Sequence, residues 1–163
     1  MPLLEHTEED RRTVETQIGR SLRGDWAVAR RCHLGIPMVI ENHPLIDDGS
    51  PFPTLFWLTC PILVKRASKL EAAGRMGGLN EVLAGSESLR ARVEEASARY
   101  RARRDGHSNV SFEGAPPGGV ERIKCLHAHL AHELADSPNP VGAMTLAQVG
   151  WPDCRATCVE PAP

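Results

Sequence analysis

The chain has 163 residues, of which 41% are hydrophobic and 4% aromatic, and its formal net charge is −2. This length suffices for one domain with a mainly aliphatic core. The near-neutral charge provides no global field to attract nucleic acid or an anionic membrane. No stretch approaches the roughly 18 apolar residues of a membrane helix, and the polar start of the chain does not resemble a secretory signal. We therefore expect a cytoplasmic protein without membrane insertion or nucleic-acid binding.

The first part of the chain predicts one helix followed by three strands. Residues 7–23 have the four-residue apolar spacing of an amphipathic helix. Residues 26–32 and 36–41 read as a hairpin with a three-residue turn. Pro37 lacks an N–H group, so we expect the second strand to lie at a sheet edge or to begin after this residue. Residues 54–60 form the third predicted strand.

The remainder of the chain is predominantly helical in pattern. Glycine and proline separate the periodic segments, which predict helices at residues 61–73, 77–84, 86–104, 120–135 and 141–149. Residues 105–119, rich in glycine and proline, predict a flexible loop. These elements indicate an α+β fold with a small antiparallel sheet of three strands, covered by four or five helices. We assign residues 1–150 to a single domain and residues 151–163 to a tail containing cysteine and proline.

Nine residues, from 124 to 132, contain one cysteine and three histidines. On a helix that turns about 100° per residue, Cys125, His129 and His132 project within one arc, whereas His127 points to the opposite side. Thiol and imidazole groups together suit zinc. The pattern therefore predicts one wall of a metal site that needs a ligand from another segment. The alternative is a helix that is simply buried, with small and apolar residues around histidines whose hydrogen bonds are satisfied.

Cys60 is the expected partner, because it lies where the third strand meets the following helix. Amide dipoles at a helix N-terminus lower the pKa of a thiol, which suits metal ligation or nucleophilic chemistry. The predicted metal site thus consists of Cys60, Cys125, His129 and His132. Zinc is the expected ion, ahead of an iron–sulfur cluster, for which no typical spacing is present.

The other three cysteines leave alternatives open. Cys154 and Cys158 have three intervening residues, within the range of metal-binding pairs. They can replace a histidine of the predicted site, form a second site, or remain free thiols. Cys32 lies at the hairpin turn, where sulfur and backbone N–H groups are exposed, and can join either site.

Three classes of function are compatible with this pattern. The first is binding of a structural or catalytic metal ion, and the second is a regulatory or assembly role through protein partners. The third is a hydrolase, using either metal-bound water with His127 or Glu133 as base, or Cys60 as nucleophile with a helix histidine as base.

Three segments, residues 48–61, 124–132 and 139–142, resemble the signatures of the family called domain of unknown function 501. The likeness extends from Thr13 to Cys158 and implies an uncharacterised bacterial protein, with no activity to carry over. Relatives tend to have a Cys-x-Cys-Gly turn where this chain has Cys32-His33-Leu34-Gly35. The resemblance therefore does not imply a two-cysteine knuckle at this turn unless His33 substitutes.

Overall fold

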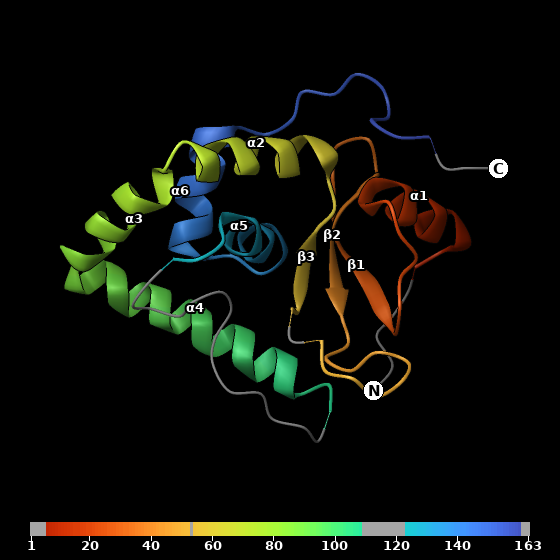
Figure 1. Cartoon of the computed structure of the whole chain (residues 1–163), viewed down its shortest axis with the longest axis horizontal. Coiled ribbons are helices and arrows are strands. Elements are labelled where there is room, and N and C mark those ends of the chain that lie inside the picture. Colours follow the sequence, from red (N-terminus) through yellow and green to blue (C-terminus); the bar gives the residue numbers. More distant parts are fainter. Residues whose placement is uncertain (1–5, 53, 109–122, 161–163) are drawn as a thin grey trace.

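A three-stranded antiparallel sheet lies between one N-terminal helix and a group of later helices (Figure 1). The computed structural model describes residues 6–52, 54–108 and 123–160. The elements in these ranges are α1 (Glu8–Ile18), β1 (Trp26–Arg31), β2 (Pro37–Asn42), β3 (Phe56–Leu58), α2 (Pro61–Ala72), α3 (Arg75–Ala84), α4 (Glu87–Asp105), α5 (Leu126–Ala135) and α6 (Pro140–Val149). The predicted α+β class is confirmed. In the described part of the chain, no helix combines the length and apolar character needed to cross a membrane.

The strands follow one another in the order β1-β2-β3. Trp26 of β1 pairs with Asn42 of β2, and Ile40 of β2 pairs with Trp57 of β3. The expected edge position for the strand containing Pro37 is wrong, because β2 is the central strand. Proline is tolerated there because it is the first residue of the strand.

Helix α1 is shorter than predicted. It begins after Thr7, whose side chain forms a capping box with Asp10, and ends at Ile18 instead of continuing to residue 23. Gly19 then adopts a left-handed conformation with φ 72°, which terminates the helix. The apolar spacing continues past this point, and Leu22 packs on the same cluster as Ile18 without being helical.

Helix α5 also begins later than predicted. Cys125 is its N-cap residue and has an extended backbone, and the preceding described residues, 123 and 124, are not helical. Residues 120–122 and most of the predicted loop at 105–119 lie outside the described residues. Because Cys125 precedes α5, its side chain does not follow the helical rotation expected from the sequence. This difference determines which residues the thiol contacts.

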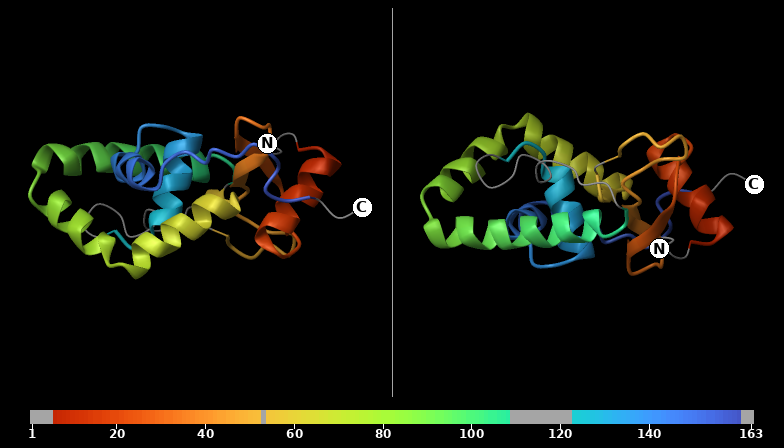
Figure 2. Two further views of the ribbon diagram at one scale, coloured as in Figure 1. Left: turned by 90° about the horizontal axis from the view of Figure 1, so that it is seen from above. Right: turned by 90° about the horizontal axis from the view of Figure 1, so that it is seen from below.

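The two faces of the sheet have different partners. On one face Val14 of α1 packs against Trp26 and Ile40. On the other face Val39 and Phe56 belong to the cluster that includes the inner residues of α5. Figure 2 shows α2, α3 and α4 forming a frame in which α5 and α6 lie. Helix α5 is thus enclosed by the sheet and by other helices.

The described part of the C-terminal tail, residues 151–160, contains no helix or strand. It leaves α6, passes over the beginning of α2 and continues past the sheet toward α1 (Figures 1 and 2). Arg66 of α2 donates hydrogen bonds to the carbonyl groups of Val149 and Gly150, which fixes the start of the tail.

Candidate metal site at the start of helix α5

Glu71, Cys125 and His127 bring a carboxylate, a thiol and an imidazole together. Their potential ligand atoms all lie within 4.8 Å of one another, and each residue is partly buried. His127 Nδ1 is 3.0 Å from Glu71 Oε1 and 3.9 Å from Cys125 Sγ. Around a tetrahedral zinc ion, sulfur, nitrogen and oxygen ligands are about 3.4 to 3.6 Å apart, as zinc bond lengths require. Small side-chain adjustments therefore suffice for these three groups to bind one ion.

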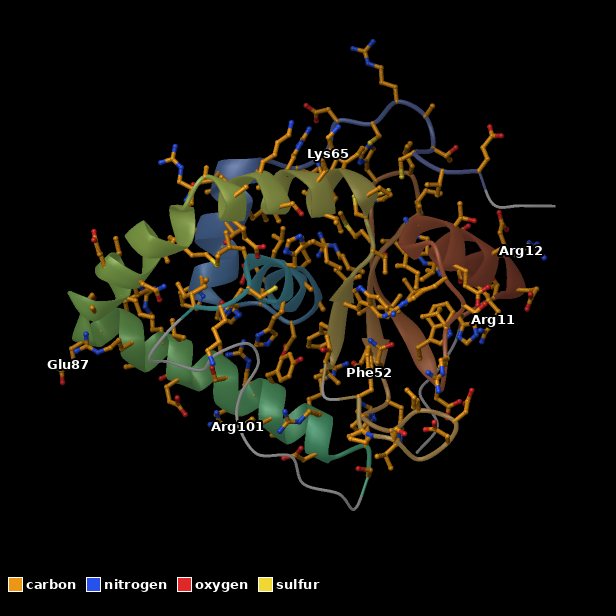
Figure 3. The ribbon with its side chains drawn as sticks, viewed as in Figure 1. Arg11, Arg12, Phe52, Lys65, Glu87 and Arg101 are labelled. Carbon is orange, nitrogen blue, oxygen red and sulfur yellow. The ribbon has the colours of Figure 1, made fainter. Side chains whose placement is uncertain are left out.

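Helix α2 supplies the acidic residue and fixes the imidazole. Glu71 Oε1 accepts a hydrogen bond of 2.8 Å from the backbone N–H of Leu126 and so caps α5 from a neighbouring helix. His127 Nε2 lies 3.1 Å from the Val64 carbonyl oxygen and 3.0 Å from Ser68 Oγ. Lys65, on the same helix, points away from α5 (Figure 3). One face of α2 thus contacts the start of α5.

The hydrogen bonds of His127 determine its tautomer. A carbonyl oxygen only accepts hydrogen bonds, so His127 Nε2 carries a hydrogen toward Val64. Nδ1 is then the nitrogen that faces Cys125 and Glu71. A histidine that binds metal usually donates its other N–H to a carbonyl or carboxylate, as this one does. Without metal, the Cys125 thiol and then the Glu71 carboxylate raise the pKa of His127 to about 9, although burial opposes them.

The same geometry does not fit a nucleophilic triad. In such a triad one imidazole nitrogen faces the nucleophile and the other faces the acidic residue. Here Nδ1 of His127 faces both Cys125 and Glu71, while Nε2 faces Val64 and Ser68. If His127 took a proton from the Cys125 thiol, no separate acidic residue on the far side of the ring would orient the imidazole.

One sequence expectation about His127 and Cys125 is corrected by this arrangement, and one residue of the cluster was missed. His127 was expected on the opposite side of the helix from Cys125, but the two side chains are in contact. The 100° rotation per residue applies only within a helix, and Cys125 precedes the first helical residue with φ −152° and ψ 115°. Glu71 was missed because one acidic residue on a helix surface has no distinguishing sequence signal.

His129 and His132 have a different partner, Asn139. The Oδ1 atom of Asn139 accepts the N–H of Gly142, so its Nδ2 faces the two rings, at 3.1 Å from Nδ1 of each. Both Nδ1 atoms therefore accept hydrogen bonds, and each neutral ring carries its hydrogen on Nε2. Within the described part of the chain neither buried Nε2 atom has a hydrogen-bond partner, although that of His132 lies 3.6 Å from Asp136 Oδ2. Metal ligation by these histidines requires this hydrogen to be lost or the Asn139 bridge to break.

Burial is the main cause of the lowered pKa values of this pair. It lowers the pKa of His129 to about 4 and also lowers that of His132. Phe56 and Tyr100 pack against the His132 ring. The two imidazoles are therefore neutral over most of the physiological range and belong to the core of the molecule.

Cys60 is buried at the N-cap of α2, as its position between strand and helix predicted. The expected lowering of its pKa is wrong: burial raises the pKa of the thiol more than the amides of Ile62 and Leu63 lower it. This direction does not favour a reactive nucleophile at Cys60.

The four residues predicted as one metal site are not gathered into one cluster. Among the described residues, the cluster formed by Glu71, Cys125 and His127 includes only Cys125 of that set. Cys60 lines a pocket with three other cysteines. Metal binding by Cys60, Cys125, His129 and His132 together stays a prediction, and the observed distances favour other groupings.

Residues 28–147 match the family model described as protein of unknown function (DUF501). The chain belongs to this family. The match contains Glu71, Cys125 and His127, and it ends before Cys154 and Cys158. No curated protein and no solved structure matches the chain.

Proposed function

We propose that this DUF501 protein binds a divalent transition metal ion, zinc by its ligand chemistry, through Glu71, Cys125 and His127. The observation that supports this proposal is the convergence of three ligand atoms within 4.8 Å, from two different helical segments. The hydrogen bond from His127 Nε2 to the Val64 carbonyl adds the support that a metal-binding imidazole needs.

The ligand set also indicates the kind of site. Mixed sulfur, nitrogen and oxygen donors suit zinc better than magnesium or calcium, which prefer oxygen alone. Three protein ligands leave one position of a tetrahedral ion for water, and all three residues are partly exposed. This is the ligand count of catalytic zinc sites, and hydrolysis is the reaction class such a site would serve.

The bases suggested by the sequence for a hydrolase are both engaged. His127 Nδ1 is itself in the ligand cluster. Glu133 accepts a hydrogen bond from the backbone N–H of Asn139 and so holds the loop between α5 and α6. Metal binding is therefore the function proposed here, and a hydrolytic activity would have to use a different proton acceptor.

Metal content tests the proposal directly. The full-length protein is purified without a histidine tag, equilibrated with zinc and desalted. Its zinc content is then measured by inductively coupled plasma mass spectrometry. We expect Cys125→Ala and His127→Ala each to remove one equivalent relative to wild type. Glu71→Gln should weaken binding while keeping the amide oxygen that caps Leu126.

Ser68→Ala is the matched control, because Ser68 contacts His127 on the side away from the ligand cluster. It should retain the zinc content of the wild type. Circular dichroism confirms that each variant is folded. Wild-type zinc content in both folded Cys125→Ala and His127→Ala would show that the cluster is only a helix cap and an ion pair.

A further inference from the structure

Four of the five cysteines line one small pocket. Cys32 comes from the turn between β1 and β2, Cys60 from the junction of β3 and α2, and Cys154 and Cys158 from the C-terminal tail. The pocket volume is about 20 Å³, room for a single atom or ion of the size of a water molecule. Burial, and to a smaller extent Cys158 and Cys154, raise the pKa of the Cys60 thiol; burial, Cys154 and Cys32 raise that of Cys158. Segments far apart in the sequence thus bring thiols to one place.

The other residues around this pocket offer no group that would compete with the thiols for a bound ion. Apart from Gln17 and His33, they are apolar. Trp151 Nε1 donates to His33 Nδ1 at 3.2 Å, so His33 Nε2 is the nitrogen that donates to the Cys154 carbonyl oxygen at 2.6 Å. Both nitrogens of His33 are therefore used in holding the tail. His33 positions the tail cysteines and is not available as a ligand.

A backbone N–H group donates to one of the sulfur atoms, that of Cys32. The N–H of Leu34 donates to Cys32 Sγ at 3.4 Å within the hairpin turn, which Gly35 completes with φ 78°. At the start of α2, Cys60 forms no side-chain cap hydrogen bond with the described residues of this helix; burial raises the pKa of its thiol, and the amides of Leu63 and Ile62 oppose this increase. Such N–H···S bonds stabilise thiolates, the form in which cysteine binds metals.

We propose that Cys32, Cys60, Cys154 and Cys158 bind one zinc ion as a closed four-sulfur site that fastens the C-terminal tail to the sheet. Four protein ligands are the pattern of structural zinc sites, which contribute directly to folding free energy. The site proposed above at Glu71, Cys125 and His127 (the Glu71 cluster) differs from this four-sulfur site in having three mixed ligands and an open position. The two sites would share no ligand.

Binding requires an inward rotation of some thiols. Sulfur atoms around a tetrahedral zinc ion are about 3.8 Å apart, given zinc–sulfur bonds of about 2.3 Å. No three of these four sulfurs lie within 4.8 Å of one another. Cys154 and Cys158 lie on a segment without helix or strand, and Cys158 is exposed, so their side chains can turn without disturbing the core.

The test compares the double variant Cys154→Ser/Cys158→Ser with Thr157→Ala, a control in the same exposed segment. Both are made in the full-length, untagged protein, which is kept reduced and equilibrated with zinc or cobalt. We expect the double variant to contain one equivalent of zinc less than the wild type and to lose most of the sulfur-to-cobalt charge-transfer absorption. Thr157→Ala should match the wild type in both measurements.

Limited trypsin digestion gives a readout that is local to the tail. Arg155 lies between the two tail cysteines and is exposed, so trypsin can cleave after it. Zinc at 100 times its dissociation constant should slow this cleavage about a hundredfold in the wild type, because cleavage needs the released tail. Zinc should not slow the same cleavage in the double variant.

Cys125→Ala separates this site from the one proposed above. It should lose zinc from the Glu71 cluster while keeping zinc-dependent protection at Arg155. Unchanged zinc content and cobalt absorption in Cys154→Ser/Cys158→Ser would overturn the four-sulfur site. Mass spectrometry after alkylation that found a disulfide among these cysteines in the reduced, zinc-treated wild type would overturn it as well.

Discussion

Asn139 connects two structural tasks through one side chain. Its Oδ1 atom caps helix α6 by accepting the N–H of Gly142, and its Nδ2 atom bridges His129 and His132. The side chain is 3% exposed, so none of these groups can exchange its partner for bulk water. Buried polar groups that lose a hydrogen-bond partner cost about 1 to 3 kcal/mol each. Loss of the bridge to the two histidines should therefore lower the free energy of unfolding more than loss of the helix cap.

Asn139→Ser tests this at the residue scale. Serine is also a good N-cap residue, but it has no amide hydrogens for the two imidazoles. We expect its free energy of unfolding to fall by about 2 to 4 kcal/mol, from two unpaired Nδ1 acceptors. Urea denaturation measures this quantity. Ser86→Ala, which removes only the cap of α4, should cost about 1 kcal/mol, and an equal loss in both variants would refute the bridge.

At the scale of elements, α5 and α6 pack unusually closely at Gly142. A Cβ atom built at this position would lie 2.1 Å from the backbone oxygen of His129 and 2.6 Å from Cβ of Glu133. Only glycine lets the first turn of α6 approach the backbone of α5 in this way. This approach also brings Asn139 within reach of the two histidines.

Gly142→Ala should therefore destabilise the protein, although alanine is the better helix former. We expect a loss of about 2 to 3 kcal/mol, the usual scale for overpacking a core, with the backbone of α6 forced outward. Gly78→Ala is the matched control, since Gly78 is also helical and a Cβ there meets no atom of the described residues within 4 Å. It should gain about 0.5 to 1 kcal/mol. Thermal or urea unfolding of both variants measures the difference. A Gly142→Ala variant as stable as the wild type would contradict the expected overpacking.

At the scale of the whole molecule, the enclosure of α5 makes stability sensitive to acid. In the unfolded chain His129 and His132 take up protons below a pKa of about 6.5. In the folded protein burial lowers the pKa of each to about 4. Between these values the unfolded state binds more protons, so the free energy of unfolding falls as pH decreases. His127, whose pKa is raised to about 9, changes stability only above this window.

Urea denaturation at pH 7, 6 and 5, with a chelator present to remove metal effects, should show this decrease. His129 alone accounts for a loss of about 3 kcal/mol over the full window down to pH 4. Asp10→Asn provides a control, because Arg31 lowers the pKa of Asp10 to about 2 and its carboxylate is ionised in both states above pH 5. This variant should lower stability equally at pH 7 and pH 5. A wild-type stability independent of pH in this range would refute the assignment.

Local sequence features predicted most of the fold. The helices predicted at residues 61–73 and 86–104 begin within a residue of α2 and α4, because helix ends depend on nearby backbone groups. The three strands also follow from apolar segments, and the antiparallel pairing of β1 with β2 follows from the short turn between them. The end of α1 was predicted too late, since apolar spacing continued beyond the glycine that stops the helix.

The sequence by itself determined that the thiols and imidazoles are present and that Cys125 lies beside a helix of histidines. Only the tertiary structure decided which of them meet. Packing of α2 against α5 placed Glu71 beside Cys125 and His127. Packing of α6 against α5 placed Asn139, the N-cap residue of α6, beside His129 and His132. The path of the tail over the sheet brought Cys154 and Cys158 to Cys32 and Cys60. These groupings depend on contacts between distant segments, and the periodicity within one helix carries no information about them.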